Sequence, residues 1–202
     1  SSDDDAIGND YYNQGYVFFS LDPVEVNIVG DSIDLEMRIM EGPQATINKV
    51  RINGNDRLYE NIVRRELRTK PGDLFNKDAL ERSYREIAQM GHFNPENIQP
   101  DVQPDATNGT VDINWNLESK PNDQIEFSAG WGQTGVIGKL SLKFTNFSMS
   151  NLFRKNDNYR GIIPQGDGQT LTVSGQTNGS YYQSYSISFL DPWFGGKRPN
   201  SL

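Results

Sequence analysis

Hydrophobic and polar residues alternate along the C-terminal part of the chain. From Gln124 onward, apolar side chains recur at every second position in segments that are separated by glycine-, asparagine- and serine-rich connections. A period of two residues predicts β-strands with one apolar and one polar face. We therefore expect strands near residues 125–131, 136–145, 170–174 and 181–189, and we expect no helix in this part of the chain.

A mixed pattern precedes these strands. Residues 47–52 alternate as a strand, and the turn signal Asn53-Gly54-Asn55 ends it. Helical spacing then predicts a helix near residues 58–68, capped by Asn55 or Asp56. Its inward-facing residues should be Leu58, Ile62 and Leu67.

A second helix is predicted between the N-cap Asn76 and the C-terminal Gly91. Prolines then accompany a short strand around residues 98–103, and proline cannot donate to a ladder, so this strand should lie at a sheet edge. A final alternating strand follows at residues 111–118, which gives the order β-α-α-β-β. The buried face of the second helix should comprise Leu80, Tyr84, Ile87 and Ala88.

Part of this pattern occurs twice in the chain. Residues 14–16 and 33–39 are similar to residues 90–92 and 111–117, at nearly constant spacing. A module of roughly 80 residues in tandem explains this repeat better than a solenoid unit does. The first copy lacks its front half, so we divide the chain into residues 1–42, the complete module at 43–120, and the strands at 121–202.

Composition excludes several classes of function. The 202 residues carry 19 Lys and Arg against 27 Asp and Glu, a formal net charge of −8, which disfavours nucleic-acid binding. The absence of cysteine excludes a disulfide scaffold and a thiolate metal site. The one histidine, His92, reads as a structural residue. We therefore predict no catalytic residue, no cofactor and no metal.

One glycine motif is misleading. Residues 130–135 match the G-x-G-x-x-G spacing of dinucleotide sites, but a strand follows the motif where a helix is required. The glycines are better explained by a tight hairpin.

A membrane location is compatible with the strands. The sequence contains no apolar run of about 18 residues, so it has no transmembrane helix, whereas a transmembrane β-strand needs only about 9 to 11 alternating residues. The polar positions are largely Ser, Thr, Gln and Lys, which suits a wet lumen. Four strands cannot close a barrel, so the rest of the barrel must lie outside this sequence. A soluble β-sandwich is the alternative.

Several motifs are specific enough to indicate a family, and they are Lys49-Val50-Arg51-Ile52-Asn53-Gly54-Asn55, Arg64-Arg65-Glu66-Leu67, Pro71-Gly72-Asp73-Leu74-Phe75, Leu80 with Ser83, Met90-Gly91-His92-Phe93, the strand at 111–118, Asn151-Leu152-Phe153 and the run at 188–194. Those up to residue 118 together resemble a POTRA domain, and nearly all of residues 12–196 resembles the BamA family of outer-membrane β-barrel assembly factors. One departure is His92, where the family usually carries tyrosine. The resemblance implies an α+β fold, with POTRA modules followed by antiparallel strands of an incomplete transmembrane β-barrel.

The resemblance also implies a function. Proteins of this family fold and insert other outer-membrane proteins without ATP, which implies nascent outer-membrane proteins, accessory assembly lipoproteins and the lipid bilayer as partners. It places the chain in the outer membrane with its POTRA part in the periplasm. The alternatives are a two-partner secretion transporter of the same superfamily and a soluble periplasmic peptide-binding protein.

Function in such a protein lies in strand edges rather than in reactive groups. The first barrel strand would pair with substrate strands, and the edge strand of the POTRA domain could bind extended partners by β-augmentation. The first set of predicted site residues is Ile125, Glu126, Phe127, Ser128, Ala129, Gly130 and Trp131. The second set is Ile98, Gln99, Asp101, Val102 and Gln103.

Overall fold

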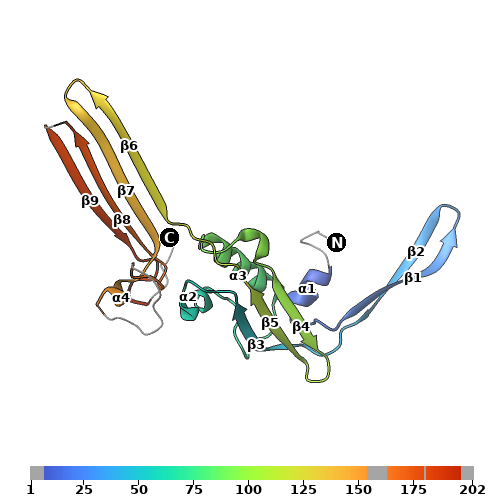
Figure 1. Ribbon diagram of the computed structural model, residues 1–202. Helices are drawn as coiled ribbons and strands as arrows, with labels where there is room; N and C mark the ends of the chain where they lie inside the picture. Colours follow the sequence, from blue (N-terminus) through green and yellow to red (C-terminus); the bar gives the residue numbers. More distant parts are fainter. Residues whose placement is uncertain (1–6, 154–162, 180, 197–202) are drawn as a thin grey trace. The chain divides into compact units, whose positions relative to one another are not determined.

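The computed structural model describes residues 7–153, 163–179 and 181–196, which form two compact units (Figure 1). Unit 1 comprises residues 1–54, 66–90 and 95–118. Unit 2 comprises residues 55–65, 91–94 and 119–202. The fold is α+β, with a small mixed sheet in unit 1 and an antiparallel sheet in unit 2. The predicted domain boundaries at residues 42 and 120 stay predictions.

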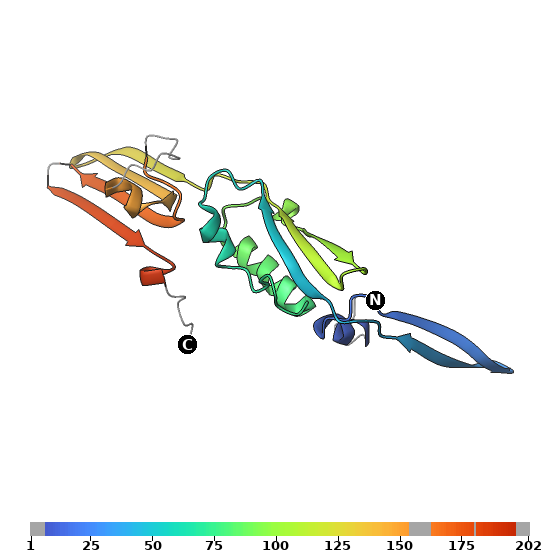
Figure 2. The ribbon, with the colours of Figure 1, turned by 90° about the horizontal axis from the view of Figure 1, so that it is seen from below.

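The mixed sheet of unit 1 has the strand order β3-β5-β4. Strands β3 (Thr46–Asn53) and β5 (Thr110–Asn116) are parallel, whereas β4 (Pro100–Asp105) is antiparallel to β5. The helix α3 (Lys77–Gln89) lies beside the sheet in Figure 2. The core of unit 1 consists of apolar residues that alternate on these strands and on α3, among them Ile47, Val50, Leu80, Ile87, Val111, Ile113 and Trp115.

Helix α3 begins and ends as its sequence predicts. Asn76 has an extended backbone, and its Oδ1 accepts a hydrogen bond from Ala79 N at 2.8 Å. Gly91 follows the helix with φ +72°, a conformation that glycine adopts at little cost. The side chain of Ser83 is fully buried on this helix and accepts Arg68 N at 2.8 Å. The predicted helix and its ends are confirmed, and Leu80 and Ile87 are buried as predicted. Tyr84 and Ala88 are only half-buried, so the prediction that both lie on the buried face was wrong, and Ser83 lies there instead.

The first helix of the module is shorter than predicted. Helix α2 spans only Glu60–Arg64, and its N-cap is Tyr59, which makes no side-chain capping bond. Asn55 instead closes the preceding turn, where its Oδ1 accepts Leu58 N at 3.3 Å. Backbone groups beyond the helix find tertiary partners, which replace the helical bonds that the sequence pattern predicted. The predicted inward residues Leu58, Ile62 and Leu67 are buried.

A hairpin and a short helix precede the module. Strands β1 (Ser20–Val29) and β2 (Ser32–Met40) pair antiparallel, and α1 (Ile7–Asn13) leads into them. The order α1-β1-β2 repeats the order α3-β4-β5, and Gly15 has φ +87° where Gly91 has its positive φ. The sequence analysis did not predict α1. Its C-terminal Asn13 accepts Asp78 N at 2.9 Å, so the start of α3 holds it in place.

The sheet of unit 2 has the order β6-β7-β8-β9, and all neighbouring strands are antiparallel. Its strands are β6 (Gln124–Gly132), β7 (Gly135–Phe147), β8 (Gln169–Asn178) and β9 (Tyr182–Leu190), so the four predicted strands are confirmed. The expectation of no helix here is wrong, because α4 (Met149–Phe153) follows β7. This helix has only five residues, and a side-chain bond from Asn151 N to Ser148 Oγ supports it.

Register places apolar side chains of all four strands on one face of this sheet. Phe127 pairs with Leu140, and Leu142 pairs with Val173, which in turn pairs with Ile187. Phe127 is 72% exposed and Ile187 77%, so no second layer covers them within the described residues. A soluble sandwich would bury such a face, whereas membrane strands present it to lipid. The opposite face carries Glu126, Ser128, Lys139, Ser141, Lys143, Thr172, Ser174, Gln176, Ser184, Ser186 and Ser188.

Among the described residues, no helix has the length and apolar character needed to cross a membrane.

Candidate functional site

Strand β6 forms an edge of its sheet and pairs, among the described strands, with β7 alone. Gly179 N donates to Val136 O at 2.9 Å, so the backbone of Val136 faces β8 rather than β6. Its partner Trp131 therefore directs its own N–H and C=O away from β7, because the two residues of a non-hydrogen-bonded pair face outward. Alternation extends this orientation along the strand. The outward backbone groups belong to Ile125, Phe127, Ala129 and Trp131.

The remaining predicted residues of β6 face the other way. The backbones of Glu126, Ser128 and Gly130 bond to β7, and the side chains of the first two lie on the polar face of the sheet. Glu126 forms an ion pair with Lys139 at 3.2 Å, but both side chains are exposed, so this pair contributes little to stability. The predicted site thus divides into a set that offers backbone hydrogen bonds and a set that holds the strand to its neighbour.

The POTRA edge strand begins later than predicted. Strand β4 starts at Pro100, because a 3₁₀ turn at Pro95–Asn97 precedes it. Ile98 is fully buried and lies outside the strand, as does the exposed Gln99, so assigning both to the edge strand was wrong. Asp101, Val102 and Gln103 do lie in β4, which occupies an edge of the sheet as its prolines predict. Whether this edge binds a partner stays a prediction.

The direction of the backbone groups in β4 follows from its neighbour β5. Leu117 N donates to Asn53 O at 2.9 Å, so Leu117 faces the end of β3. By alternation, Asp112 and Asn114 face β4 and bond to Gln103 and Asp101. The free edge of β4 therefore consists of the backbone groups of Pro100, Val102 and Pro104.

Unit 2 also contains a buried polar cluster, which consists of Thr145, Asn146, Ser148 and Asn151. Asn146 is only 4% exposed and lies at an irregularity in the β7-β8 register. Its Nδ2 donates to Arg57 O at 2.8 Å, and its Oδ1 accepts Gly166 N at 3.2 Å and Gly168 N at 3.1 Å. One amide side chain therefore joins three separate segments of this unit.

Further bonds extend the cluster. Asp123 Oδ1 accepts Thr145 N at 2.9 Å, and the other carboxylate oxygen of Asp123 lies 3.4 Å from Arg57 Nη2. Asn151 Nδ2 donates to Tyr59 OH at 2.6 Å. These contacts hold the residues before α2 against the end of β7.

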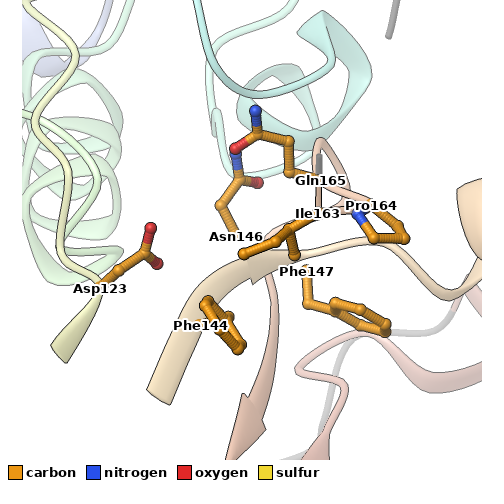
Figure 3. Close-up of a pocket in the computed structure, with 7 residues that line it drawn as sticks. All are labelled: Asp123, Phe144, Asn146, Phe147, Ile163, Pro164 and Gln165. Atoms are coloured by element: carbon orange, nitrogen blue, oxygen red, sulfur yellow. The ribbon is translucent and has the colours of Figure 1, made fainter. Parts of the chain in front are cut away.

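A cavity of about 40 Å³ lies beside this cluster (Figure 3). It has room for about one water molecule, whereas sites for organic ligands usually have about 300 Å³ or more. The described residues hold no group of three or more His, Cys, Asp or Glu that could bind a metal ion. The lining residues are Asp123, Phe144, Asn146, Phe147, Ile163, Pro164 and Gln165.

His92 belongs to the same unit and is partly buried. Burial lowers the pKa of its imidazole, and the neighbouring Arg57 lowers it further, while Asp123 opposes both. The neutral form is therefore favoured, as suits a packed ring.

The chain is similar to proteins of known family. Residues 45–120 match the POTRA family, described as "Surface antigen variable number repeat". Over 93% of its length, the chain is 28% identical to the "Outer membrane protein assembly factor BamA" of Neisseria meningitidis. Over 95%, it is 24% identical to a "Putative outer membrane protein assembly factor" of Treponema pallidum. The chain is a homologue of BamA-type assembly factors.

The fold is also similar to that of a solved BamA structure. The crystal structure of BamA from Haemophilus ducreyi lacking POTRA domains 1–3 matches 94% of the chain with a TM-score of 0.69, at 19% identity. The chain corresponds to 32% of that structure. It spans about a fifth of the two curated BamA-type relatives, 22% and 21% of their lengths.

Sequence reasoning located both edge strands of this BamA homologue but missed the buried polar cluster. The available signal was the segment from Thr145 to Ser148, where polar residues at three of four positions interrupt the alternation at the end of an apolar strand. Such a run predicts that the strand ends in a hydrogen-bonded corner.

Proposed function

We propose that the protein folds nascent β-barrel proteins and inserts them into the outer membrane by pairing their strands with β6. The observation that supports this most is the free edge of β6, where Ile125, Phe127, Ala129 and Trp131 direct their backbone groups away from β7. The side chains of these residues lie on the apolar face, and Trp131 is 83% exposed. Among the described residues this edge is thus unpaired, and its side chains are suited to lipid.

The driving force is backbone pairing in a medium without water. Every N–H and C=O of a strand in hydrocarbon must find a protein partner, because an unpaired group is costly there. A preformed edge gives the first strand of a client such a partner before its own barrel closes. This process needs no nucleotide and no covalent chemistry.

The proposed partners follow from this role. They are nascent outer-membrane proteins, the lipid bilayer and accessory assembly lipoproteins. The chain is an outer-membrane segment whose POTRA part lies in the periplasm, in line with its relatives. The predicted role of β4 in β-augmentation, through Asp101, Val102 and Gln103, has less support than the role of β6. Four residues of β6 direct a backbone N–H outward, whereas on β4 only Val102 does.

A proline substitution tests the role of β6. Ala129→Pro removes an N–H from the free edge without removing a β6-β7 hydrogen bond, since the backbone of Ala129 faces outward. We expect the whole protein carrying this change to insert a client β-barrel into liposomes several-fold more slowly than the wild type.

Ala129→Val is the matched control, because valine alters the side chain at the same position but keeps the N–H. It should insert the client at close to the wild-type rate. The heat-dependent gel shift of the folded barrel checks that both variants fold. An Ala129→Pro variant that folds and inserts clients at the wild-type rate rules out templating at this edge.

A further inference from the structure

The free edges of β6 and β4 differ in the hydrogen bonds that they can donate. At β6 each of the outward residues Ile125, Phe127, Ala129 and Trp131 has an N–H group. At β4 the outward residues are Pro100, Val102 and Pro104, so Val102 carries the one N–H of this edge. An added strand requires alternating donors and acceptors along its length. The β4 edge offers carbonyl acceptors but almost no donors.

We propose that Pro100 and Pro104 close the β4 edge of the POTRA domain to strand addition, so that an incoming β-strand pairs at β6 rather than at β4. The proposal rests on the proposed function only for the identity of the incoming strand, a segment of a nascent outer-membrane protein. Pro100 and Pro104 thereby become determinants of specificity. They act by withholding hydrogen bonds, a common way for proteins to protect exposed sheet edges.

The positions of the two prolines support this role. Proline in a bonded position would cost β4 a hydrogen bond to β5, but Pro100 and Pro104 pair with Trp115 and Val111, whose backbones face β3. Both prolines therefore leave the sheet itself intact. Their effect falls on the outer side of β4, where a partner would lie.

The preceding hairpin shows the same arrangement. The loop at Gly30 and Asp31 is flanked by the pair Val29 and Ser32, which are hydrogen-bonded in a two-residue hairpin. By alternation along β2, the backbone of Met37 faces away from β1, and the backbone of its partner Pro23 faces away from β2. The corresponding strands of both repeats thus carry proline where an N–H would meet a partner. Strand β6 contains no proline.

The β6 edge also sets the register of an incoming strand. Its hydrogen-bonded residues must lie opposite Ile125, Phe127, Ala129 and Trp131, and side chains of paired residues share a face. The client residues at these positions therefore face lipid with the apolar side chains of β6. We expect a strand with apolar residues at alternate positions, none of them proline, to pair best.

Photo-crosslinking tests the proposal on the whole protein in lipid nanodiscs. A benzophenone side chain replaces Gln103 on β4 or Glu126 on β6, and the probe is a synthetic peptide of alternating apolar and polar residues, equivalent to one barrel strand. In the protein that keeps Pro100 and Pro104, we expect crosslinks from position 126 and no crosslinking above the unspecific level from position 103. Equally strong crosslinks from both positions would overturn the proposal.

The second part of the experiment restores backbone N–H donors to the β4 edge. The double variant Pro100→Val, Pro104→Val restores two donors and should raise crosslinking from position 103 several-fold. Pro71→Val, in the exposed turn before α3, is the control and should leave it at background. An unchanged yield in the folded double variant contradicts the proposal. Loss of crosslinking from position 126 alone would instead count against the proposed function, so the two failures are distinguishable.

Amide hydrogen exchange on the unmodified protein does not depend on any variant. Addition of the peptide should slow exchange of the N–H groups of Ile125, Phe127, Ala129 and Trp131. It should leave exchange of Val102 N–H unchanged. Protection of Val102 by the peptide would show that the β4 edge accepts a strand despite its prolines.

Discussion

Replacement of Asn146 by alanine removes three hydrogen bonds from the buried polar cluster. The bonds run to Arg57 O at 2.8 Å, from Gly168 N at 3.1 Å and from Gly166 N at 3.2 Å. A buried polar group left without a partner costs about 1 to 3 kcal/mol. Water can enter the space that the side chain leaves and form hydrogen bonds with some of the backbone groups that Asn146 bonded. We therefore expect a loss of about 3 kcal/mol in the free energy of opening this corner.

Hydrogen exchange measures this loss locally. Because about 1.4 kcal/mol corresponds to a factor of ten, the amide of Gly168 should exchange roughly a hundredfold faster in Asn146→Ala than in the wild type. Gly166 N also donates to the backbone carbonyl of Asn146 at 3.1 Å, which the variant keeps, so its amide should accelerate less. The assay is exchange of the protein in detergent micelles, followed by proteolysis and mass spectrometry.

Gln44→Ala serves as the control. Gln44 also donates from an amide side chain to a backbone carbonyl, Gln14 O at 3.0 Å, but it is exposed. Its loss should change exchange of the two glycine amides by less than about twofold, since water replaces an exposed partner at little cost. An Asn146→Ala variant with exchange as slow as in this control would refute the assignment of Asn146 as the centre of the cluster.

Two further predictions concern the same unit. Because burial and Arg57 lower the pKa of His92 in the folded state, the unfolded state binds more protons below about pH 6.5, and stability should fall as the pH drops through the folded pKa. Urea unfolding at about pH 7.5 and 5.5 should show this fall in the free energy of unfolding. An equal fall in the His92→Tyr variant would exclude His92 as its source. Gly166 has φ +131°, and an added Cβ would lie 2.7 Å from the Tyr59 ring, so Gly166→Ala should lower stability by about 1 to 3 kcal/mol in urea unfolding. Gly130→Ala has open space and should be nearly neutral; equal losses in both would remove the steric explanation.

The sequence predicts the parts of the fold that have a strong local period. Strands β6 to β9 follow from alternation, since one face is apolar and the other polar along each strand. Helix α3 follows from its apolar face together with Asn76 and Gly91, which mark its ends chemically. In these elements the local pattern and the tertiary environment agree.

The errors arise where tertiary contacts override the local pattern. The helix predicted at 58–68 ends at Arg64, and the next segment bonds elsewhere, as Arg68 N does to Ser83 Oγ. Helices α1 and α4 are too short to show a period, and contacts such as the bond from Asp78 N to Asn13 Oδ1 support them. Ile98 looked like a strand residue but is buried after a 3₁₀ turn.

The candidate site was predicted in position but not in detail. The sequence located β6 and β4 as edges, yet the direction of each backbone group depends on hydrogen bonds to neighbouring strands. The bonds Gly179 N to Val136 O and Leu117 N to Asn53 O join residues far apart in the chain. Register of this kind cannot be obtained from one strand alone.

Strand pairing between β6 and a client is the central claim, and disulfide trapping tests it most directly. Ser128→Cys would lie in a non-hydrogen-bonded pair with the incoming strand, where side chains approach most closely. The 202 residues contain no cysteine of their own, which keeps the reaction specific to this position. With single cysteines along the last strand of a client barrel, we expect disulfides at alternate client positions and none at the positions between them. Disulfides formed equally at all positions, or at none during insertion, would contradict the account.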